Sequence, residues 1–250
     1  MFRNPRYPVV LCHGLFGFDY IGFEKYPKLQ INYWSGVTEA LTNNKCDFLV
    51  GKVHPTASIR MRAHSLADQI RAKFPDQKVN LVGFSMGGLD ARYVAAKELV
   101  PVDSVTTVST PHRGSSFADW CFEQFNPDSR RLIESLLRRL DINISGFENL
   151  TTKGTTKFNQ QNPNNPNTKY YSFASSIEST KIFKLSFKIV SEREGPNDGL
   201  VSVKSAEWGQ LIDVLNVDHM DLSSNWESSS GFDVGLFYLK WIDSLYQRGH

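Results

Sequence analysis

Short apolar runs separated by amphipathic segments extend through most of this 250-residue chain. Apolar runs bounded by Pro, Gly or polar residues are typical of buried strands. They predict strands at 8–12, 47–50, 79–82, 102–107, 169–174 and 187–190. Between them, apolar residues recur at helical spacing and predict helices at 58–74, 88–99 and 232–246. This alternation indicates an α/β fold with a mostly parallel central sheet flanked by helices.

The region at about 113–168 departs from this alternation of strands and helices. Within it, 130–141 predicts an amphipathic helix whose opposite face is rich in arginine. Its apolar face carries Leu132, Ile133, Leu136, Leu137 and Leu140. A polar loop rich in Asn and Pro is expected at 158–166. With no internal repeat and no linker between separate cores, we expect a single domain over 1–250 with a helical insertion at about 113–168.

The segment 83–87 (GFSMG) joins a predicted strand to a predicted helix. In that context the pattern is typical of a nucleophile elbow, a sharp turn that exposes a serine at a helix N-terminus. Flanking glycines let the strand and the helix approach closely because they lack a Cβ. The pattern therefore predicts Ser85 as a nucleophile. The alternative is a Gly-rich turn with an inert serine.

A serine nucleophile needs a base, and in α/β-hydrolases the chain order is Ser, then Asp or Glu, then His. His219, just before the last predicted helix, fits that order. His112 follows the strand at 102–107 too closely to be the late base. His250, the last residue, is expected to be frayed. The alternative for His219 is an ordinary surface histidine.

Asp198 is the best candidate for the acid, because it lies in a turn, 196–201, where a carboxylate can point back at the base. The alternative is an Asp-Gly turn residue that caps its own backbone. Asp213, Asp218 and Asp221 compete with it. Asp218 and Asp221 are too close in sequence to His219 for the usual arrangement on separate loops.

Acyl transfer also needs backbone donors where the oxyanion forms. One donor is the N–H after the nucleophile, here that of Met86. The loop after the first strand, 12–17 (CHGLFG), is expected to supply the other from Leu15. Gly14 permits unusual backbone angles in this loop, and His13 is expected to brace it by hydrogen bonding.

Six segments in this order resemble the triacylglycerol lipases typified by the Pseudomonas and Burkholderia enzymes, and fungal intracellular lipases share the pattern. They are 12–19 (CHGLFGFD), 83–94 (GFSMGGLDARYV), 109–115 (STPHRGS), 149–162 (NLTTKGTTKFNQQN), 197–202 (NDGLVS) and 218–222 (DHMDL). The resemblance implies an α/β-hydrolase fold with Ser85 as nucleophile, Asp198 as acid and His219 as base. It also implies Leu15 and Met86 as oxyanion donors and the insertion as a mobile lid. The alternative for the insertion is a surface helix that packs on the sheet.

Secreted bacterial members of that family hold a structural calcium partly with two aspartates. Asp221 matches the second, but 172–180, where the first should lie, contains no Asp. A single carboxylate would bind calcium weakly, so no cofactor is expected. The family's disulfide near the acid loop is not expected either, because no cysteine follows Cys121.

Composition and charge indicate which partners and which compartment to expect. The net charge of +2 gives no reason to expect a nucleic-acid partner, and no apolar run approaches the ~20 residues of a membrane span. The first residues contain no stretch like a signal peptide, and the three widely spaced cysteines favour a reducing compartment. We therefore expect an intracellular protein, although two glycosylation sequons at 143–145 and 149–151 favour a secreted one.

The sequence thus predicts a serine carboxylester hydrolase that cleaves acylglycerols and makes transient contact with a lipid droplet or membrane surface. A phospholipase, a thioesterase or an acyltransferase would use the same triad. A catalytically silent hydrolase fold that binds lipid is the alternative from a different class. Reaction of Ser85 with a fluorophosphonate probe distinguishes enzyme from binder.

Overall fold

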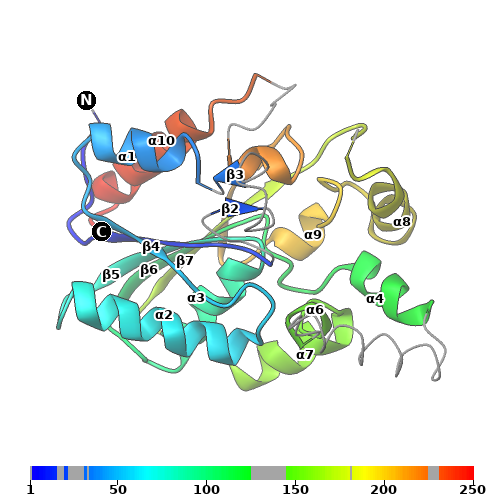
Figure 1. Ribbon diagram of the computed structural model, residues 1–250, viewed down its shortest axis with the longest axis horizontal. Coiled ribbons are helices and arrows are strands. Elements are labelled where there is room, and N and C mark those ends of the chain that lie inside the picture. Colours follow the sequence, from blue (N-terminus) through cyan, green and yellow to red (C-terminus); the bar gives the residue numbers. More distant parts are fainter. Residues whose placement is uncertain are drawn as a thin grey trace.

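A computed structural model describes residues 2–15, 20–21, 31–32, 34–124, 145–180, 182–224 and 231–250. Six strands form one parallel sheet in the order β4-β1-β5-β6-β7-β8, shown in Figure 1. They are β1 (Val9–Cys12), β4 (Phe48–Gly51), β5 (Val79–Phe84), β6 (Val102–Val108), β7 (Lys169–Ser175) and β8 (Gln210–Leu215). A separate antiparallel pair joins β2 (Tyr20–Ile21) to β3 (Ile31–Asn32).

The strand order reverses at β1. The chain passes from β1 outward to β4, then returns to β5 on the other side of β1 and continues to β8. Such a reversal leaves a crevice beyond the carboxyl ends of the two central strands, where α/β proteins bind their ligands. The loop after β1 and the turn after β5 both lie there.

Helices cover both faces of the sheet. The helices α1 (Val37–Asn43) and α10 (Val234–Gln247) pack on one face, and α2 (Ile59–Lys73) and α3 (Met86–Ala96) on the other (Figure 1). The helix α2 begins where the Ser58 hydroxyl accepts the N–H of Met61, and its buried residues recur every three or four positions. None of the described helices is long and apolar enough to cross a bilayer.

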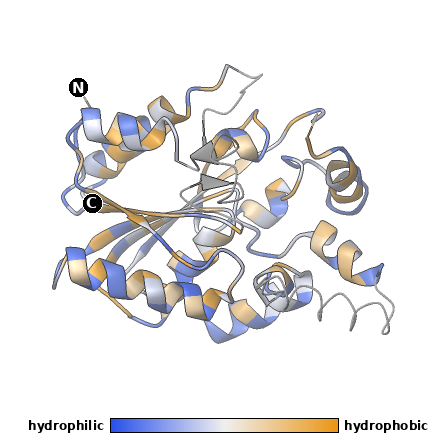
Figure 2. Cartoon of the chain, in the orientation of Figure 1, coloured by the Kyte–Doolittle hydropathy of each residue, from blue (hydrophilic) through white to orange (hydrophobic). Residues whose placement is uncertain are grey.

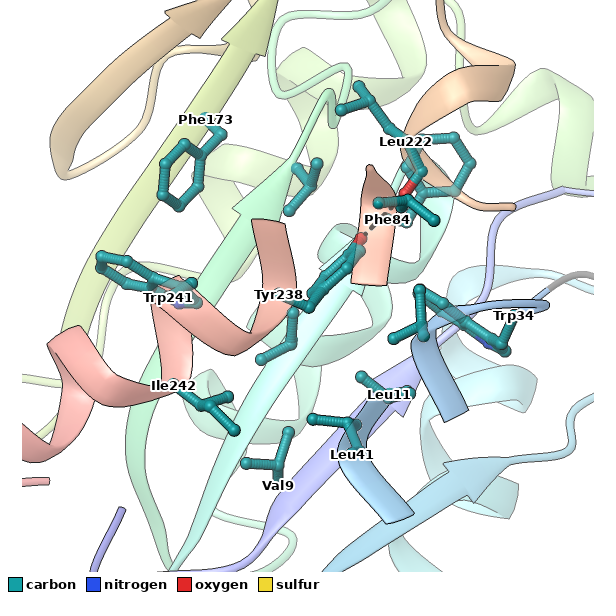
Figure 3. Close-up of a cluster of buried hydrophobic side chains, with 14 of the residues drawn as sticks. Val9, Leu11, Trp34, Leu41, Phe84, Phe173, Leu222, Tyr238, Trp241 and Ile242 are labelled. Atoms are coloured by element: carbon teal, nitrogen blue, oxygen red, sulfur yellow. Dashed lines mark hydrogen bonds between the residues drawn. The ribbon is translucent and has the colours of Figure 1, made fainter. Parts of the chain in front are cut away.

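Apolar residues concentrate on the central strands, while hydrophilic and hydrophobic positions alternate along the covering helices (Figure 2). Figure 3 shows the cluster between α10 and the sheet. There the Trp241 ring packs edge-on against Phe173, with ring centroids 4.9 Å apart. The Tyr238 hydroxyl donates to Leu222 O over 3.0 Å and thereby ties α10 to the segment that follows β8.

Shorter helices lie beyond one end of the sheet, away from the chain termini (Figure 1). Between β6 and β7 the structure describes α4 (Ser116–Glu123), α6 (Ser145–Glu148) and α7 (Thr152–Gln161). Between β7 and β8 lie α8 (Lys184–Glu194) and α9 (Val203–Ala206), and the 3-10 turn η2 (Met220–Leu222) follows β8. The helix expected at 130–141, with Leu132, Ile133, Leu136, Leu137 and Leu140, is outside the described residues.

Two of the predicted elements were wrong. Residues 187–190 are part of α8, and the last strand of the sheet is β8. A short apolar run fits a helix as well as a strand. Here the buried residues, Ser186, Ile189 and Val190, follow helical spacing. The polar loop expected from 158 begins only after Gln161, because α7 continues to that residue.

His250 is buried rather than frayed. Its Nδ1 lies 2.7 Å from Asp103 Oδ2, and its Nε2 lies 2.8 Å from the Tyr171 hydroxyl. Its backbone oxygen accepts the N–H of Arg6 over 2.6 Å. These bonds fix a position that chain-end reasoning expected to be loose.

Candidate active site

Ser85 occupies a strained turn between β5 and α3. Its backbone has φ 53° and ψ −129°, the left-handed half of conformational space that non-glycine residues rarely adopt. Its N–H donates to Val108 O over 2.9 Å, which holds the turn against β6. A Cβ at Gly87 would overlap the carbonyl oxygens of Cys12 and His13, so this close approach requires glycine.

His219 and Asp198 form a buried pair beside this turn. The Nδ1 of His219 lies 2.8 Å from Asp198 Oδ2, and the backbone N–H of His219 donates to Asp198 O over 3.0 Å. The imidazole packs against Phe84, with ring centroids 4.7 Å apart, and the ring of Phe183 meets it edge-on at 6.4 Å. Two aromatic rings thus limit how the imidazole can turn.

The Asp198 carboxylate is completely buried. Burial alone would raise its pKa, but the charge and hydrogen bond of His219 lower it, as do the backbone N–H groups of Val201 and Leu200. Those two N–H groups donate to Oδ1 over 2.8 and 3.0 Å. The net effect holds the pKa of Asp198 below its usual value, so the carboxylate is ionised when it faces His219.

The competing groups have other partners. Asp213 lies in β8, where its Oδ1 accepts the N–H of Val214. Asp218 Oδ1 accepts the N–H groups of Met220 and Asp221 and so caps η2. His112 is buried against Arg92 and Thr107; burial and then the charge of Arg92 lower its pKa well below the usual range.

Several contacts brace the loop after β1. Val53 N–H donates to His13 Nε2 over 3.4 Å, which leaves Nδ1 to donate to Gly14 O over 2.9 Å. Arg62, buried in α2, donates to the carbonyls of His13 and Gly14 over 2.5 and 3.3 Å. The carbonyls of His13 and Gly14 are thereby held beside the elbow.

Both expected oxyanion donors are close to this loop and turn. Met86 is the first residue of α3, and the N–H groups of a first helical turn have no partner within the helix. Leu15 follows the braced carbonyls, and its side chain lines the same cavity as Ser85.

An apolar cavity of about 330 Å³ opens on the serine. Its polar lining residues are Ser85, Ser115 and His219. The remaining lining residues are Leu15, Pro111, Phe117, Ala118, Phe147, Leu150, Phe183, Leu200, Val201 and Met220. Such a cavity suits an apolar ligand whose one polar end meets Ser85 and His219.

Among the described residues, no cluster of three or more His, Cys, Asp or Glu side chains has the arrangement of a metal site. Asp221, the one residue that matches a calcium ligand of the family, is buried in η2. Asp218 lies near it: burial and then the charge of Asp221 raise the pKa of Asp218.

Sequence reasoning missed four residues of this region. Arg62 could have been found, because it interrupts the apolar face of the helix at 58–74. Phe183 carries no such signal. Ser109 directly follows β6 and Ser175 ends β7; the Ser175 hydroxyl bonds to Asp198, and the Ser109 hydroxyl bonds to Ser175.

Comparisons with known proteins identify the family of the chain. The profile of a family described as alpha/beta hydrolase fold matches residues 54–193. Triacylglycerol lipase 2 of Saccharomyces cerevisiae is 32% identical, with 99% of this chain and 94% of the yeast protein covered. A triacylglycerol lipase of Vibrio cholerae is 30% identical, with 88% of this chain and 80% of the bacterial protein covered.

Solved structures share the fold. The lipase of Staphylococcus hyicus has a TM-score of 0.72 at 19% identity, with 98% of both chains covered. A mature lipase of Bacillus licheniformis has a TM-score of 0.71 at 24% identity, with 97% of this chain and 92% of that chain covered. The chain therefore belongs to the α/β-hydrolase fold family, and its relationship to triacylglycerol lipases along nearly its whole length makes it a serine hydrolase.

Proposed function

We propose that the protein is a carboxylester hydrolase that cleaves acylglycerols through a Ser85–His219–Asp198 triad. One observation supports this most strongly: the strained Ser85 and the imidazole of His219, which is paired with the buried Asp198, line one apolar cavity. The Ser85 side chain does not cap its own helix, so its hydroxyl is available for chemistry.

In the proposed reaction, His219 takes the proton of Ser85 as the alcohol attacks the ester carbonyl. Asp198 holds the imidazole in the required tautomer and stabilises the imidazolium that forms. The N–H groups of Leu15 and Met86 stabilise the tetrahedral oxyanion. His219 then protonates the departing glycerol-side alcohol, activates water, and the acyl-enzyme is hydrolysed. Every group in this sequence belongs to the chain, so we propose that it needs no cofactor and no calcium.

An acyl chain is the ligand that best suits the cavity, because all but three lining residues are apolar. The names of the relatives, triacylglycerol lipases, point to the same substrate class. A phospholipase, a thioesterase or an acyltransferase remains the alternative on this triad, since the apolar lining would accept any of their acyl groups.

We propose that a lipid surface is the physical partner and that the tip of α8 contacts it. Ile182 and Leu185 have exposed fractions of 62% and 56%. Between them Phe183 turns inward to line the cavity, so the same short segment faces both solvent and the substrate site. Lys184 and Lys188, also exposed, can meet anionic headgroups. The insertion over 113–168, a lid in the resemblance, would add to this contact.

A reducing compartment suits the three cysteines, which are all free thiols. Burial raises the pKa of Cys12 far above its usual value, so this thiol stays protonated and unreactive. The Oδ1 of Asn149, in the second sequon, accepts the N–H of Ile59 over 3.1 Å and so ties the insertion to the start of α2.

The decisive experiment measures the hydrolysis rate of a triacylglycerol through its solubility limit, with Ser85→Ala as the control. A rate that jumps when droplets form, with no activity in the variant, supports a true lipase. A rate that saturates below the limit and favours short soluble esters supports an esterase. No fluorophosphonate labelling of Ser85 and no ester turnover would support a silent binding module.

A further inference from the structure

Two buried hydroxyls extend the line of hydrogen bonds from His219 through Asp198. The Ser175 Oγ lies 2.9 Å from Asp198 Oδ2, and the Ser109 Oγ lies 2.5 Å from Ser175 Oγ. Both serines are completely buried at the carboxyl ends of adjacent strands. They are 23 and 89 residues before Asp198 in the chain, so no local sequence pattern connects them to it.

The chemistry of the groups fixes the direction of these bonds. An ionised carboxylate only accepts hydrogen bonds, so the hydroxyl of Ser175 must donate its single proton to Asp198. Its oxygen then accepts from Ser109, which becomes the donor at the far end. Hydrogen bonds that point the same way polarise one another, so each strengthens the next.

Ser175 also completes the set of partners around Asp198. Oδ1 accepts the N–H groups of Leu200 and Val201, and Oδ2 accepts from His219 and Ser175. A carboxylate offers about four acceptor positions, and all of them are filled here. Without Ser175, one position of a fully buried anion would have no partner, and Oδ2 would be held by His219 alone.

Ser109 has a strained backbone conformation. Its φ is 45°, an unfavourable conformation for a residue with a side chain. Its N–H donates to Phe173 O over 2.9 Å, and the preceding residue, Val108, accepts the N–H of Ser85. The end of β6 therefore holds the backbone of the nucleophile on one side and the hydroxyl that leads to Asp198 on the other.

We propose that Ser175 is a positioning residue that orients Asp198 toward His219, and that Ser109 orients Ser175 in turn. The proposal rests on the triad proposed above and deepens it. Neither serine touches the substrate cavity; both act through the acid.

The first test replaces Ser175 with Ala. We expect kcat for a short soluble ester such as p-nitrophenyl butyrate to fall about 10- to 100-fold, the range of a hydrogen bond to a charged group, with KM unchanged. A variant with the kcat of the wild type, or one that changes KM and leaves kcat alone, overturns the proposal.

The second test separates orientation from stability. In Ser109→Gly the strained φ becomes favourable, so Tm should stay level or rise, while kcat falls about 3- to 10-fold with the loss of the terminal donor. The matched control is Ser172→Ala, a buried serine of β7 whose hydroxyl accepts the Trp208 N–H. This control should lower Tm and leave kcat at the wild-type value. An unchanged kcat in Ser109→Gly contradicts the proposal that Ser109 and Ser175 orient Asp198. So does a loss of kcat in Ser172→Ala equal to that in Ser175→Ala.

Failure of the proposed roles of Ser109 and Ser175 and failure of the proposed triad give different results. If the wild type turns over the ester and Ser85 reacts with a fluorophosphonate, the proposed hydrolase with Ser85 as nucleophile stands whatever the Ser109 and Ser175 variants do. If the wild type shows neither ester turnover nor labelling, the triad and the proposed roles of Ser109 and Ser175 are both wrong.

Discussion

Arg62 and Asp90 form a buried ion pair, with Arg62 Nε 2.8 Å from Asp90 Oδ2, and the same guanidinium holds the loop after β1. Asp90 lies in α3, the helix that begins at the elbow. The pair therefore joins the two segments that are proposed to supply the oxyanion donors. Donors at such a site act only if they are held in place before the oxyanion forms.

We predict that Arg62→Met destabilises the protein by about 3–5 kcal/mol, because it leaves a buried carboxylate without its cation. We also expect kcat to fall about 10- to 100-fold, because the carbonyls of His13 and Gly14 lose their anchor. Urea denaturation and ester kinetics measure the two effects.

A double variant separates those effects. Arg62→Met with Asp90→Leu removes both charges, so much of the stability should return while kcat stays low. Recovery of the wild-type kcat in the double variant would show that Arg62 matters only as a counter-ion.

Asp198→Asn should lower kcat by about 10⁴-fold and leave the fold intact, because an amide in place of the carboxylate favours the wrong imidazole tautomer. Asp213→Asn is the matched control, since within the described part of the chain that side chain bonds only to the N–H of Val214 and should leave kcat unchanged. The reverse result would move the acid to Asp213.

Asp198 should also contribute a pH-dependent part of stability. The fold lowers its pKa, so the stabilisation is fully present above the unfolded value of about 3.9 and is lost as the pH falls below it. The Tm difference between the wild type and Asp198→Asn, which cannot titrate, should therefore change from about pH 6 to about pH 3, to the disadvantage of the wild type. A constant difference over that range would contradict the lowered pKa.

How much of this site the sequence could predict depends on how local each signal is. Ser85 lies in a turn whose glycines, strand and helix are contiguous, and His219 follows from chain order. Ser109 and Ser175 meet because β6 and β7 are neighbours in the sheet, and Asp198 reaches them from the segment after α8, so no single segment encodes these contacts. The run at 187–190 was misassigned for the opposite reason: its local pattern fits two states, and packing of α8 against α4 decides between them.

Chelation should leave stability nearly unchanged. If no calcium is bound, dialysis against EDTA followed by a thermal scan should shift Tm by less than about 2 °C, which corresponds to well under 1 kcal/mol for a domain of this size. Asp221→Asn is the companion variant, and its Tm should not respond to added calcium. A large fall in Tm that calcium reverses would restore the family's metal site and place Asp221 in it.

The tip of α8 makes the proposed contact with lipid testable without the insertion. Ile182→Ser with Leu185→Ser removes two exposed apolar side chains, so binding to vesicles of phosphatidylcholine with an anionic lipid should weaken about 10- to 100-fold. The rate on emulsified triacylglycerol should fall with it, while turnover of a short soluble ester stays close to the wild type. Met61→Ser is the control, because Met61 is 60% exposed but lies on α2, away from α8 (Figure 1). Equal losses from Met61→Ser would indicate general hydrophobic adsorption, and unchanged binding in the double variant would remove α8 from the contact surface.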